Sequence, residues 1–293
     1  MSAPKDKPFT LSNDKGAAWY KQSKDLEVLP AARRLLEEYS GIPSDDVQSH
    51  IISIRDKAWE VAPYASVGSM TWINPYILLH PAHERILARL KAGASILDCG
   101  CCFSTDLRQL AFEGAPTDRM NAFDVETAFF DIGYDFFRDK QKFKARFVHV
   151  NFVDEKDQSL DKFKGNIDII WAAKFVHLFD HEHQIQAVIK LIRVLKPQAG
   201  SMFVGSQNGF PGSMDAPIGD PKPGFQSTIK LHDEDSIRAL WKEVEARTGT
   251  RWDVEAKLID MRTIGMHKDN GTEYTRRTGY NITYIAILQE HIS

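Results

Sequence analysis

The fold of this chain is decided by residues 94–107, Ala94-Ser95-Ile96-Leu97-Asp98-Cys99-Gly100-Cys101-Cys102-Phe103-Ser104-Thr105-Asp106-Leu107. A short apolar run ends on Asp98, small residues follow, and a segment with helical spacing of its apolar residues begins at Leu107. This order predicts a buried strand, a tight turn and a helix, as in a cofactor-binding loop. In such a loop Gly100, which has no Cβ, lets a ligand approach the main chain, and backbone N–H groups of the turn face that ligand.

Asp98 indicates the charge of the expected ligand. A carboxylate at the end of the strand attracts a cationic group and repels a pyrophosphate. S-Adenosylmethionine carries both an ammonium and a sulfonium, so it suits this position better than a dinucleotide does.

A regular alternation of strands and helices surrounds the loop. The pattern predicts strands at 94–98, 119–124, 145–151, 167–171 and 200–206 and helices at 105–114, 126–139 and 182–195. Such alternation is typical of a parallel sheet with helices on both faces. A further helix begins near His232, and two final runs, 252–260 and 281–289, have no helix between them and must pair antiparallel. The expected fold is α/β, a seven-stranded, mostly parallel, Rossmann-like sheet with an antiparallel C-terminal hairpin.

Residues 1–90 are expected to form an N-terminal arm and a helical cap, and residues 91–293 the sheet domain. Apolar spacing predicts cap helices at 30–39 and from Ser44 to Val61. Most aromatic residues of the cap are expected in its core, but aromatic faces also suit a flat apolar molecule or a sulfonium. Candidates for lining an acceptor pocket are therefore Trp59, Tyr64 and Trp72.

Two segments are candidates for covering the site. Trp19 and Tyr20 either anchor the arm to its own domain or close over the site as a lid. The stretch 207–228 is rich in Gly and Pro, and it is expected to be a lid or substrate wall, with a passive loop as the alternative.

Composition narrows the class of protein. The net charge is −3 and the basic residues are scattered, so nucleic acid is not an expected partner. No apolar run approaches the ~20 residues that a bilayer requires, and the start of the chain lacks the apolar core of a signal peptide, so a cytoplasmic location is expected. The three cysteines, Cys99, Cys101 and Cys102, are expected to be small packing residues; a redox role is an alternative, and a metal site is not expected because further ligands are missing.

The order Asp-x-Gly-x-x-x-Ser at residues 98–104 resembles the first motif of class I S-adenosylmethionine-dependent methyltransferases, in which glycine occupies three alternate positions. Gly100 is retained here, whereas Cys102 and Ser104 replace the other two glycines. Residues 97–108 are more similar to the cysteine-bearing version in a family of fungal secondary-metabolite O-methyltransferases of the meroterpenoid type. The similarity extends from about His50 to the C-terminus through the segments 55–59, 90–94, 175–180 and 195–197.

The resemblance implies S-adenosylmethionine as the cofactor. Asp124 ends the second strand 26 residues after Asp98 and is expected to bind the ribose hydroxyls; it can also cap the next helix. Asn151 and Phe152 end the third strand, where the fold brings a polar group to the adenine amino group and an apolar side chain to its ring. The cofactor-binding residues expected in this way are Asp98, Gly100, Cys101, Cys102, Asp124, Val125, Asn151, Phe152 and Ala172.

The segment after the fourth strand carries the catalytic candidate, His177. It is expected to orient the acceptor oxygen or to remove a proton from a hydroxyl acceptor, and a purely structural role is the alternative. Lys174 in the same segment is a candidate for contacting the acceptor, while His181 and His183 are expected to be solvated residues at a helix start.

The resemblance implies methylation of a small, largely apolar metabolite, with carboxyl methylation slightly favoured over hydroxyl methylation; a carboxylate acceptor would need no base, so no strong catalytic pair is expected. Two alternatives stay open. One is a methyltransferase-like protein that uses the site for binding or for a non-methylating reaction, since two motif glycines are replaced. The other is an NAD(P)-dependent oxidoreductase, although its G-x-G-x-x-G motif would require glycine at position 102. A homodimer is also left open.

Overall fold

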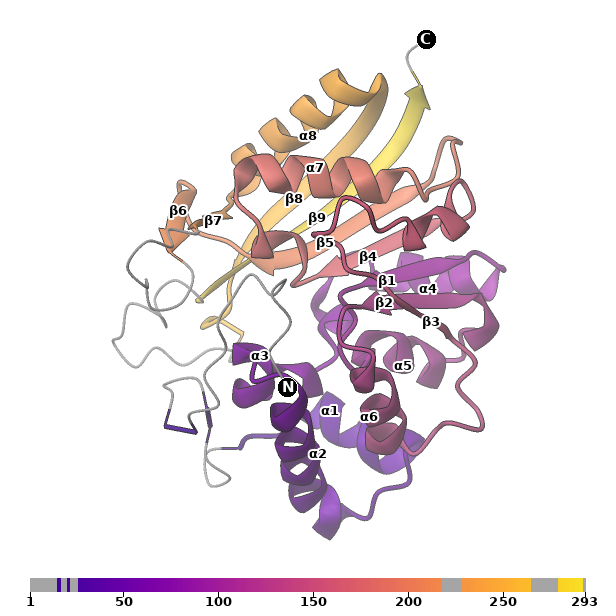
Figure 1. The fold of residues 1–293 in the computed structure, drawn as a ribbon, viewed down its shortest axis with the longest axis vertical. Coiled ribbons are helices and arrows are strands. Elements are labelled where there is room, and N and C mark those ends of the chain that lie inside the picture. The colour runs from indigo at the N-terminus through magenta and orange to yellow at the C-terminus, as the bar shows by residue number, and fades with distance from the viewer. Residues whose placement is uncertain (1–14, 17–19, 22–25, 218–227, 265–278, 292–293) are drawn as a thin grey trace. The chain divides into compact units, whose positions relative to one another are not determined.

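The computed structural model describes residues 15–16, 20–21, 26–217, 228–264 and 279–291 (Figure 1). Seven strands form one sheet in the order β3-β2-β1-β4-β5-β9-β8. The first five strands of this order are parallel, and β9 is antiparallel to both β5 and β8. The strands are β1 (Ile96–Cys99), β2 (Met120–Asp124), β3 (Arg146–His149), β4 (Ile169–Ala173), β5 (Met202–Asn208), β8 (Thr250–Asp260) and β9 (Tyr280–His291).

This arrangement confirms the predicted Rossmann-like fold with its antiparallel C-terminal pair. The helices that alternate with the strands are α4 (His83–Lys91), α5 (Thr105–Phe112), α6 (Ala128–Phe137), α7 (His181–Ile192) and α8 (Glu234–Thr248). Short helical turns connect them: η5 (Tyr76–Leu79), η6 (Thr117–Arg119), η7 (Ser159–Phe163) and η8 (Val176–Leu178). Predicted and observed boundaries differ by about one to three residues, as is usual where helix ends fray.

The described chain divides into two compact units. Unit 2 comprises residues 76–101, 114–125 and 145–293 and holds the whole sheet. One face of the sheet packs against α7 and α8, because α7 turns a stripe of Ile185, Val188 and Leu191 inward and α8 turns in Leu240 and Trp241 (Figure 1). On the other face, the Trp171 ring of β4 packs edge-on against His80 at a centroid distance of 5.3 Å.

Unit 1 comprises residues 1–75, 102–113 and 126–144. Its helices are α1 (Pro30–Arg34), the π-helical turn η2 (Leu35–Tyr39), η3 (Ser44–Asp46), α2 (Val47–Val61), α3 (Ala65–Ser69), η4 (Thr71–Ile73), α5 and α6. The apolar positions predicted for α2 are buried, and they pack in one cluster with Phe103 and the phenylalanines of α6. The domain boundary expected at residue 90 differs from this division, which assigns α5 and α6 to the same unit as the N-terminal helices.

A buried ion pair stabilises unit 1. Arg108 of α5 donates from Nε to Oδ2 of Asp139 at 2.8 Å and from Nη2 to Oδ1 at 3.1 Å, and neither side chain is exposed. Arg108 also donates from Nη1 to the carbonyl oxygen of Phe103 at 2.7 Å, while the Tyr39 hydroxyl donates to Asp139 at 2.9 Å. The pair therefore ties α5, the end of α6 and η2 together within this unit.

One strand pair was missed in the sequence. The stretch 207–228 was expected to be a lid or loop, but β6 (Met214–Pro217) lies within it and pairs antiparallel with β7 (Thr228–Leu231). β6 is short and ends on a proline, so it lacks the alternating pattern by which a strand is recognised. Residues 218–227 of the expected lid and Trp19 lie outside the described residues.

Tyr20 belongs to the core of unit 1. Its ring lies edge-on to Trp59 at a centroid distance of 4.8 Å, and its hydroxyl donates to Asp56 at 3.0 Å. These contacts match the anchoring alternative for Tyr20. None of the helices in the described ranges combines the length and the apolar character that crossing a bilayer demands.

Candidate active site

Two carboxylates end neighbouring parallel strands of unit 2. Asp98 is the third residue of β1 and Asp124 the last of β2, and they are 5% and 8% exposed. Parallel strands end at the same edge of a sheet, so both acids lie at the carboxyl edge, where this class of fold binds its ligands. Two buried acids at this edge suit a ligand that offers an ammonium and a ribose.

The backbone after β1 turns in a pattern of alternate left-handed residues. Gly100 has φ +63°, and Cys102 and Ser104 each have φ +48°. These are the three positions at which the resembling motif has glycine. The loop therefore has the backbone of a glycine-rich turn, although Cys102 and Ser104 are not glycines. The left-handed conformation stores about 1–2 kcal/mol of strain at each of these two residues.

Two positions in this loop face the protein and not the expected ligand. A Cβ at Gly100 would lie 2.6 Å from a ring carbon of Phe175, so the glycine makes room for this side chain as well as for its own left-handed backbone. The N–H of Cys101 donates to the carbonyl oxygen of Phe123 at 2.9 Å and so continues the β1–β2 ladder. At these two points the bend faces the protein itself, because Phe175 of the segment after β4 packs onto it and the ladder bond is continued by Cys101, two residues beyond the end of β1.

The cysteines of this loop differ in exposure. Cys99 and Cys101 are buried and Cys102 is partly exposed. Burial and the neighbouring Asp98 raise the pKa of the Cys99 thiol, which makes it a poor nucleophile. Within the ranges that the structure describes, no group of three His, Cys, Asp or Glu side chains could hold a metal ion.

Half-exposed apolar residues lie at the ends of β2 and β3. Val125, directly after Asp124, is 42% exposed. Phe152 is partly exposed, stacks on Phe123 at 5.9 Å and lies edge-on to Phe175 at 5.0 Å. Asn151 is partly buried, and its backbone N–H donates to Asp157 at 2.6 Å. Exposed apolar side chains at the carboxyl edge suit a flat aromatic ring such as adenine.

The segment after β4 holds His177 in a neutral state. The N–H of Asn208 donates to Nδ1 of His177 at 3.4 Å. Burial, and then the neighbouring charge of Lys174, lower the pKa of His177 to about 3. Because Nδ1 accepts, the proton of the neutral ring is on Nε2, and His177 presents an N–H donor there.

Lys174 reaches a polar cluster at the same edge. Its Nζ donates to Oδ1 of Asn208 at 2.8 Å and to Oδ1 of Asn281 at 2.6 Å, and it lies 5.3 Å from the centre of the Tyr76 ring. Burial lowers the pKa of Lys174 to about 7. Tyr76, Asn208 and Asn281 were not predicted from the sequence, although an asparagine at the end of an apolar strand such as β5 is a signal for them.

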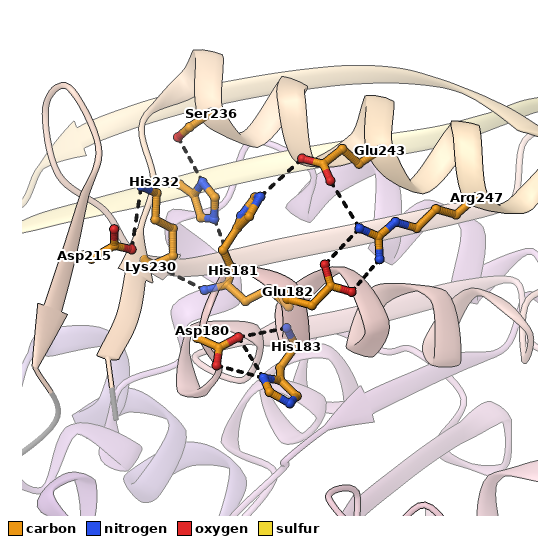
Figure 2. Close-up of polar contacts among 11 residues, drawn as sticks. Asp180, His181, Glu182, His183, Asp215, Lys230, His232, Ser236, Glu243 and Arg247 are labelled. Atoms are coloured by element: carbon orange, nitrogen blue, oxygen red, sulfur yellow. Dashed lines mark hydrogen bonds and ion pairs between the residues drawn. The ribbon is translucent and has the colours of Figure 1, made fainter. Parts of the chain in front are cut away.

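Polar contacts fix the start of α7 directly after this segment (Figure 2). Asp180 is the N-cap and accepts from the backbone N–H of His183 at 3.0 Å. In the same network Arg247 of α8 donates to both carboxylate oxygens of Glu182, and His181 Nε2 lies 3.2 Å from Glu243. His183 is exposed, as expected, with 64% of its side chain accessible. His181 is only partly exposed, and its Nδ1 is buried without a hydrogen-bond partner among the described residues. The cap fixes the first turn of α7, and the bridges link this turn to α8.

The three aromatic candidates for an acceptor pocket lie in unit 1. Trp59 is 1% exposed, and Trp72 is 7% exposed and packs edge-on between Phe103 and Phe136. Tyr64 keeps part of its surface accessible and donates from its hydroxyl to Glu126 at 3.0 Å. Of these three residues, Tyr64 is partly exposed, whereas Trp59 and Trp72 are buried.

A hollow of about 300 Å³ opens at the opposite, amino-terminal edge of unit 2. Its basic side chains are already engaged, since Lys196 pairs with Asp168 at 2.7 Å and Arg89 donates to the carbonyl oxygen of Gly200 at 2.6 Å. Asp168 directly precedes β4, whereas Lys174 directly follows it. This hollow is therefore distant from the residues that were predicted to carry the chemistry.

Comparisons with known proteins show which family the chain belongs to. A family model described as the meroterpenoid methyltransferase N-terminal domain matches residues 19–73. The O-methyltransferase atr3 of Stereocaulon alpinum is 37% identical over 280 residues, covering 95% of this chain and 79% of that protein. The O-methyltransferase phiE of a fungal species is 33% identical over 96% of this chain and 94% of its own length.

A third relative is the Asnovolin E/Chermesin D methyltransferase nvfJ of Aspergillus novofumigatus, which is 35% identical over 76% of this chain and 79% of its own length. Among solved structures, a Burkholderia thailandensis 1,6-didemethyltoxoflavin-N1-methyltransferase with bound S-adenosylhomocysteine has a TM-score of 0.49 and 13% identity, covering 82% of this chain and 90% of that one. Identity above 30% along nearly the whole chain decides the relationship. The chain belongs to this family of fungal methyltransferases, and the resemblance to S-adenosylmethionine-dependent secondary-metabolite O-methyltransferases is confirmed.

Proposed function

We propose that this protein transfers a methyl group from S-adenosylmethionine to a carboxyl oxygen of a small, largely apolar metabolite in secondary metabolism. Methyl transfer follows from the family. The apolar acceptor is supported by the meroterpenoid description of the family model and by the relative named for asnovolin E and chermesin D. The choice of a carboxyl acceptor rests on one observation, the neutral His177 that accepts at Nδ1.

The donor site is assigned to the ends of β1, β2 and β3. In this assignment the Asp98 carboxylate lies near the ammonium of the cofactor, and the Asp124 carboxylate accepts hydrogen bonds from its ribose hydroxyls. The alternate left-handed residues of the loop give the main chain the course of a glycine-rich turn. Val125 and Phe152 offer apolar surface for adenine. When bound, S-adenosylmethionine supplies an electrophilic methyl group on a positive sulfur.

His177 is poorly suited to act as a base. A group with a pKa of about 3 takes a proton from a phenol only with a large energetic cost, since an unperturbed phenol has a pKa near 10. The proton on Nε2 also occupies the lone pair that a base would use. The same N–H can donate a hydrogen bond to the acceptor oxygen and orient it. A carboxylate is already anionic at neutral pH, so it needs orientation and no base.

The remaining contribution is alignment. In methyl transfer the carboxylate oxygen bonds to the methyl carbon as the methyl–sulfur bond breaks, with the electron pair leaving on sulfur. Holding the two partners in line and excluding water can supply roughly 7–11 kcal/mol of the barrier reduction. The chain thus needs no strong catalytic pair, which agrees with a neutral His177 that accepts a hydrogen bond from the backbone of Asn208.

The test uses acceptors that carry both functional groups. Hydroxybenzoic acids and apolar terpenoid acids, with matched phenols, are incubated with the protein and methyl-labelled cofactor, and the products are separated by mass spectrometry. Labelled methyl esters are expected from the acids and no labelled ethers from the phenols. Ethers in place of esters would overturn the carboxyl assignment.

Two variants of His177 separate orientation from base catalysis. His177→Gln keeps an N–H donor near the position of Nε2, and His177→Leu removes it. If His177 orients the acceptor, the glutamine variant retains clearly more turnover than the leucine variant, and both bind S-adenosylhomocysteine like the wild type in calorimetry. Equal loss in both variants would indicate that the imidazole acts as a base.

A further inference from the structure

The ammonium of Lys174 has neutral partners. Its two hydrogen bonds go to the amide oxygens of Asn208 and Asn281, and the third direction faces the ring of Tyr76 or a ligand. In the part of the chain that the structure describes, no carboxylate forms an ion pair with Lys174 within 4.0 Å. A largely buried cation without a counter-ion is costly, which is consistent with its lowered pKa.

The protein positions this cation firmly. Lys174 has a left-handed backbone, with φ +53°, and its N–H donates to the carbonyl oxygen of Ser206 at 2.6 Å. Asn281 is 4% exposed and donates from Nδ2 to Oγ of Ser206 at 3.1 Å, so its Oδ1 is directed at the lysine. Strained backbone at non-glycine residues clusters at functional sites, although in this chain Met70 and Arg138 adopt it at helix ends. The cluster has the form of a built site for an anion.

The cluster lies next to the residues assigned to methyl transfer. Lys174 follows Ala172 by two residues at the end of β4, and Asn208 contacts both Lys174 through its side chain and His177 through its backbone. Among the residues that the structure describes, the titratable groups that interact with Lys174 are His177, which is neutral, and Tyr76. Asn208 therefore links Lys174 to His177, the residue proposed to orient the acceptor.

We propose that Lys174, held by Asn208 and Asn281, is the anchor for the acceptor's carboxylate and so selects acids over esters and phenols. The inference rests on the proposed function. One carboxylate oxygen accepts from Nζ–H of Lys174, and the other is methylated. The product is a neutral ester, which loses the ion pair and is released. Lys174 remains protonated throughout, so no proton is transferred.

The binding test uses benzoate as a plain aromatic carboxylate and benzamide as its neutral match. In protein labelled with ¹³C at the lysine ε-carbons, one resonance, assigned by its loss in Lys174→Met, is expected to move on addition of benzoate but not of benzamide. The affinity should fall about tenfold per pH unit above pH 7, as the free lysine loses its proton. Lys257→Met, at an exposed position on β8, should bind benzoate like the wild type.

A second variant retains the lysine. Asn281→Asp supplies an internal counter-ion of the same shape, so the protein is expected to fold while its benzoate affinity falls at least tenfold. Benzoate binding that is absent in the wild type, or unchanged in both Lys174→Met and Asn281→Asp, would overturn the proposal.

Turnover distinguishes this proposal from the proposed function. If Lys174→Met forms methyl esters with the acceptor KM of the wild type, the anchor is wrong while carboxyl methylation stands. If benzoate binds through Lys174 but the wild type forms no methyl ester from any acid, the carboxylate site stands and the proposed function fails. A rise of KM with a smaller change in kcat in Lys174→Met supports both.

Discussion

Cys102 and Ser104, two residues apart in the loop after β1, share the same left-handed backbone, with φ +48° at each. A left-handed non-glycine residue costs about 1–2 kcal/mol. Glycine removes this cost, although it also loses more entropy on folding. The hydroxyl of Ser104 adds a second cost, because it is buried and has no hydrogen-bond partner in the described part of the chain. The loop thus carries strain at two positions where the resembling motif has none.

We expect Cys102→Gly and Ser104→Gly each to raise the free energy of unfolding by about 0.5–1 kcal/mol. Urea unfolding measures the change. Cys101→Gly is the matched control, since the buried Cys101 lies between two of the left-handed residues but is not left-handed itself and should be destabilised by the same replacement. Destabilisation of all three variants to the same extent would contradict the role assigned to the backbone.

Gly100→Ala is expected to destabilise the protein by roughly 2–4 kcal/mol, from backbone strain together with overlap between the new methyl group and Phe175. The double variant Gly100→Ala with Phe175→Leu should recover part of the loss. Gly93 is a useful control because it also has a positive φ, +95°, but a Cβ there would meet open space. Gly93→Ala should therefore cost only the backbone strain.

Asp139→Asn is expected to destabilise unit 1 by about 3–5 kcal/mol, because it leaves the buried Arg108 without a counter-ion. Replacement of both partners, as Arg108→Met with Asp139→Leu, should recover most of this loss. The exposed pair between Lys140 and Asp131 is the comparison, and Asp131→Asn should cost less than about 1 kcal/mol. Equal losses of unfolding free energy in Asp139→Asn and Asp131→Asn would contradict the larger cost expected for leaving a buried charge unpaired.

Asp124→Asn is expected to weaken S-adenosylhomocysteine binding by about 10- to 100-fold, since hydrogen bonds to a charged group contribute roughly 1.5–3 kcal/mol. Isothermal titration calorimetry measures the affinity, and thermal unfolding should change much less. Asp118→Asn, at an exposed turn before the other end of β2, serves as the control. Affinity equal to the wild type would remove Asp124 from the cofactor site.

Stability is expected to fall below pH 6.5 because of buried histidines. Burial lowers the pKa of His80 to about 4, against about 6.5 in the unfolded chain. Between these values the unfolded state binds more protons, so the stabilisation is complete above pH 6.5 and is lost as the pH falls toward 4. The fall in unfolding free energy between pH 7.5 and 5 should be about 2 kcal/mol smaller in His80→Gln than in the wild type. If the unfolding free energy falls equally in both proteins between pH 7.5 and 5, His80 is excluded as a cause of the loss of stability.

Much of the architecture followed from local sequence. The run that ends on Asp98, the stripe of α7 and the alternation in the last strand each carry their own periodicity, and the resulting elements formed the expected sheet. Local patterns also placed Asp98 and Asp124 at strand ends, and Lys174 and His177 in the segment after the fourth strand. β6 escaped prediction because four residues that end on proline have too short a pattern.

By itself, the sequence determined the order of strands and helices, the acids at the strand ends and the family, because these depend on residues that are near neighbours in the chain. Tertiary structure alone decided that Phe175 packs against Gly100. It also decided that Asn208 accepts from Lys174 and donates to His177, and that Asn281, 107 residues after Lys174, accepts a second hydrogen bond from this lysine. These contacts join separate strands, and their geometry depends on how the sheet brings distant segments to one edge. The charge and protonation of the site are therefore properties of the folded chain, since burial and distant partners set them.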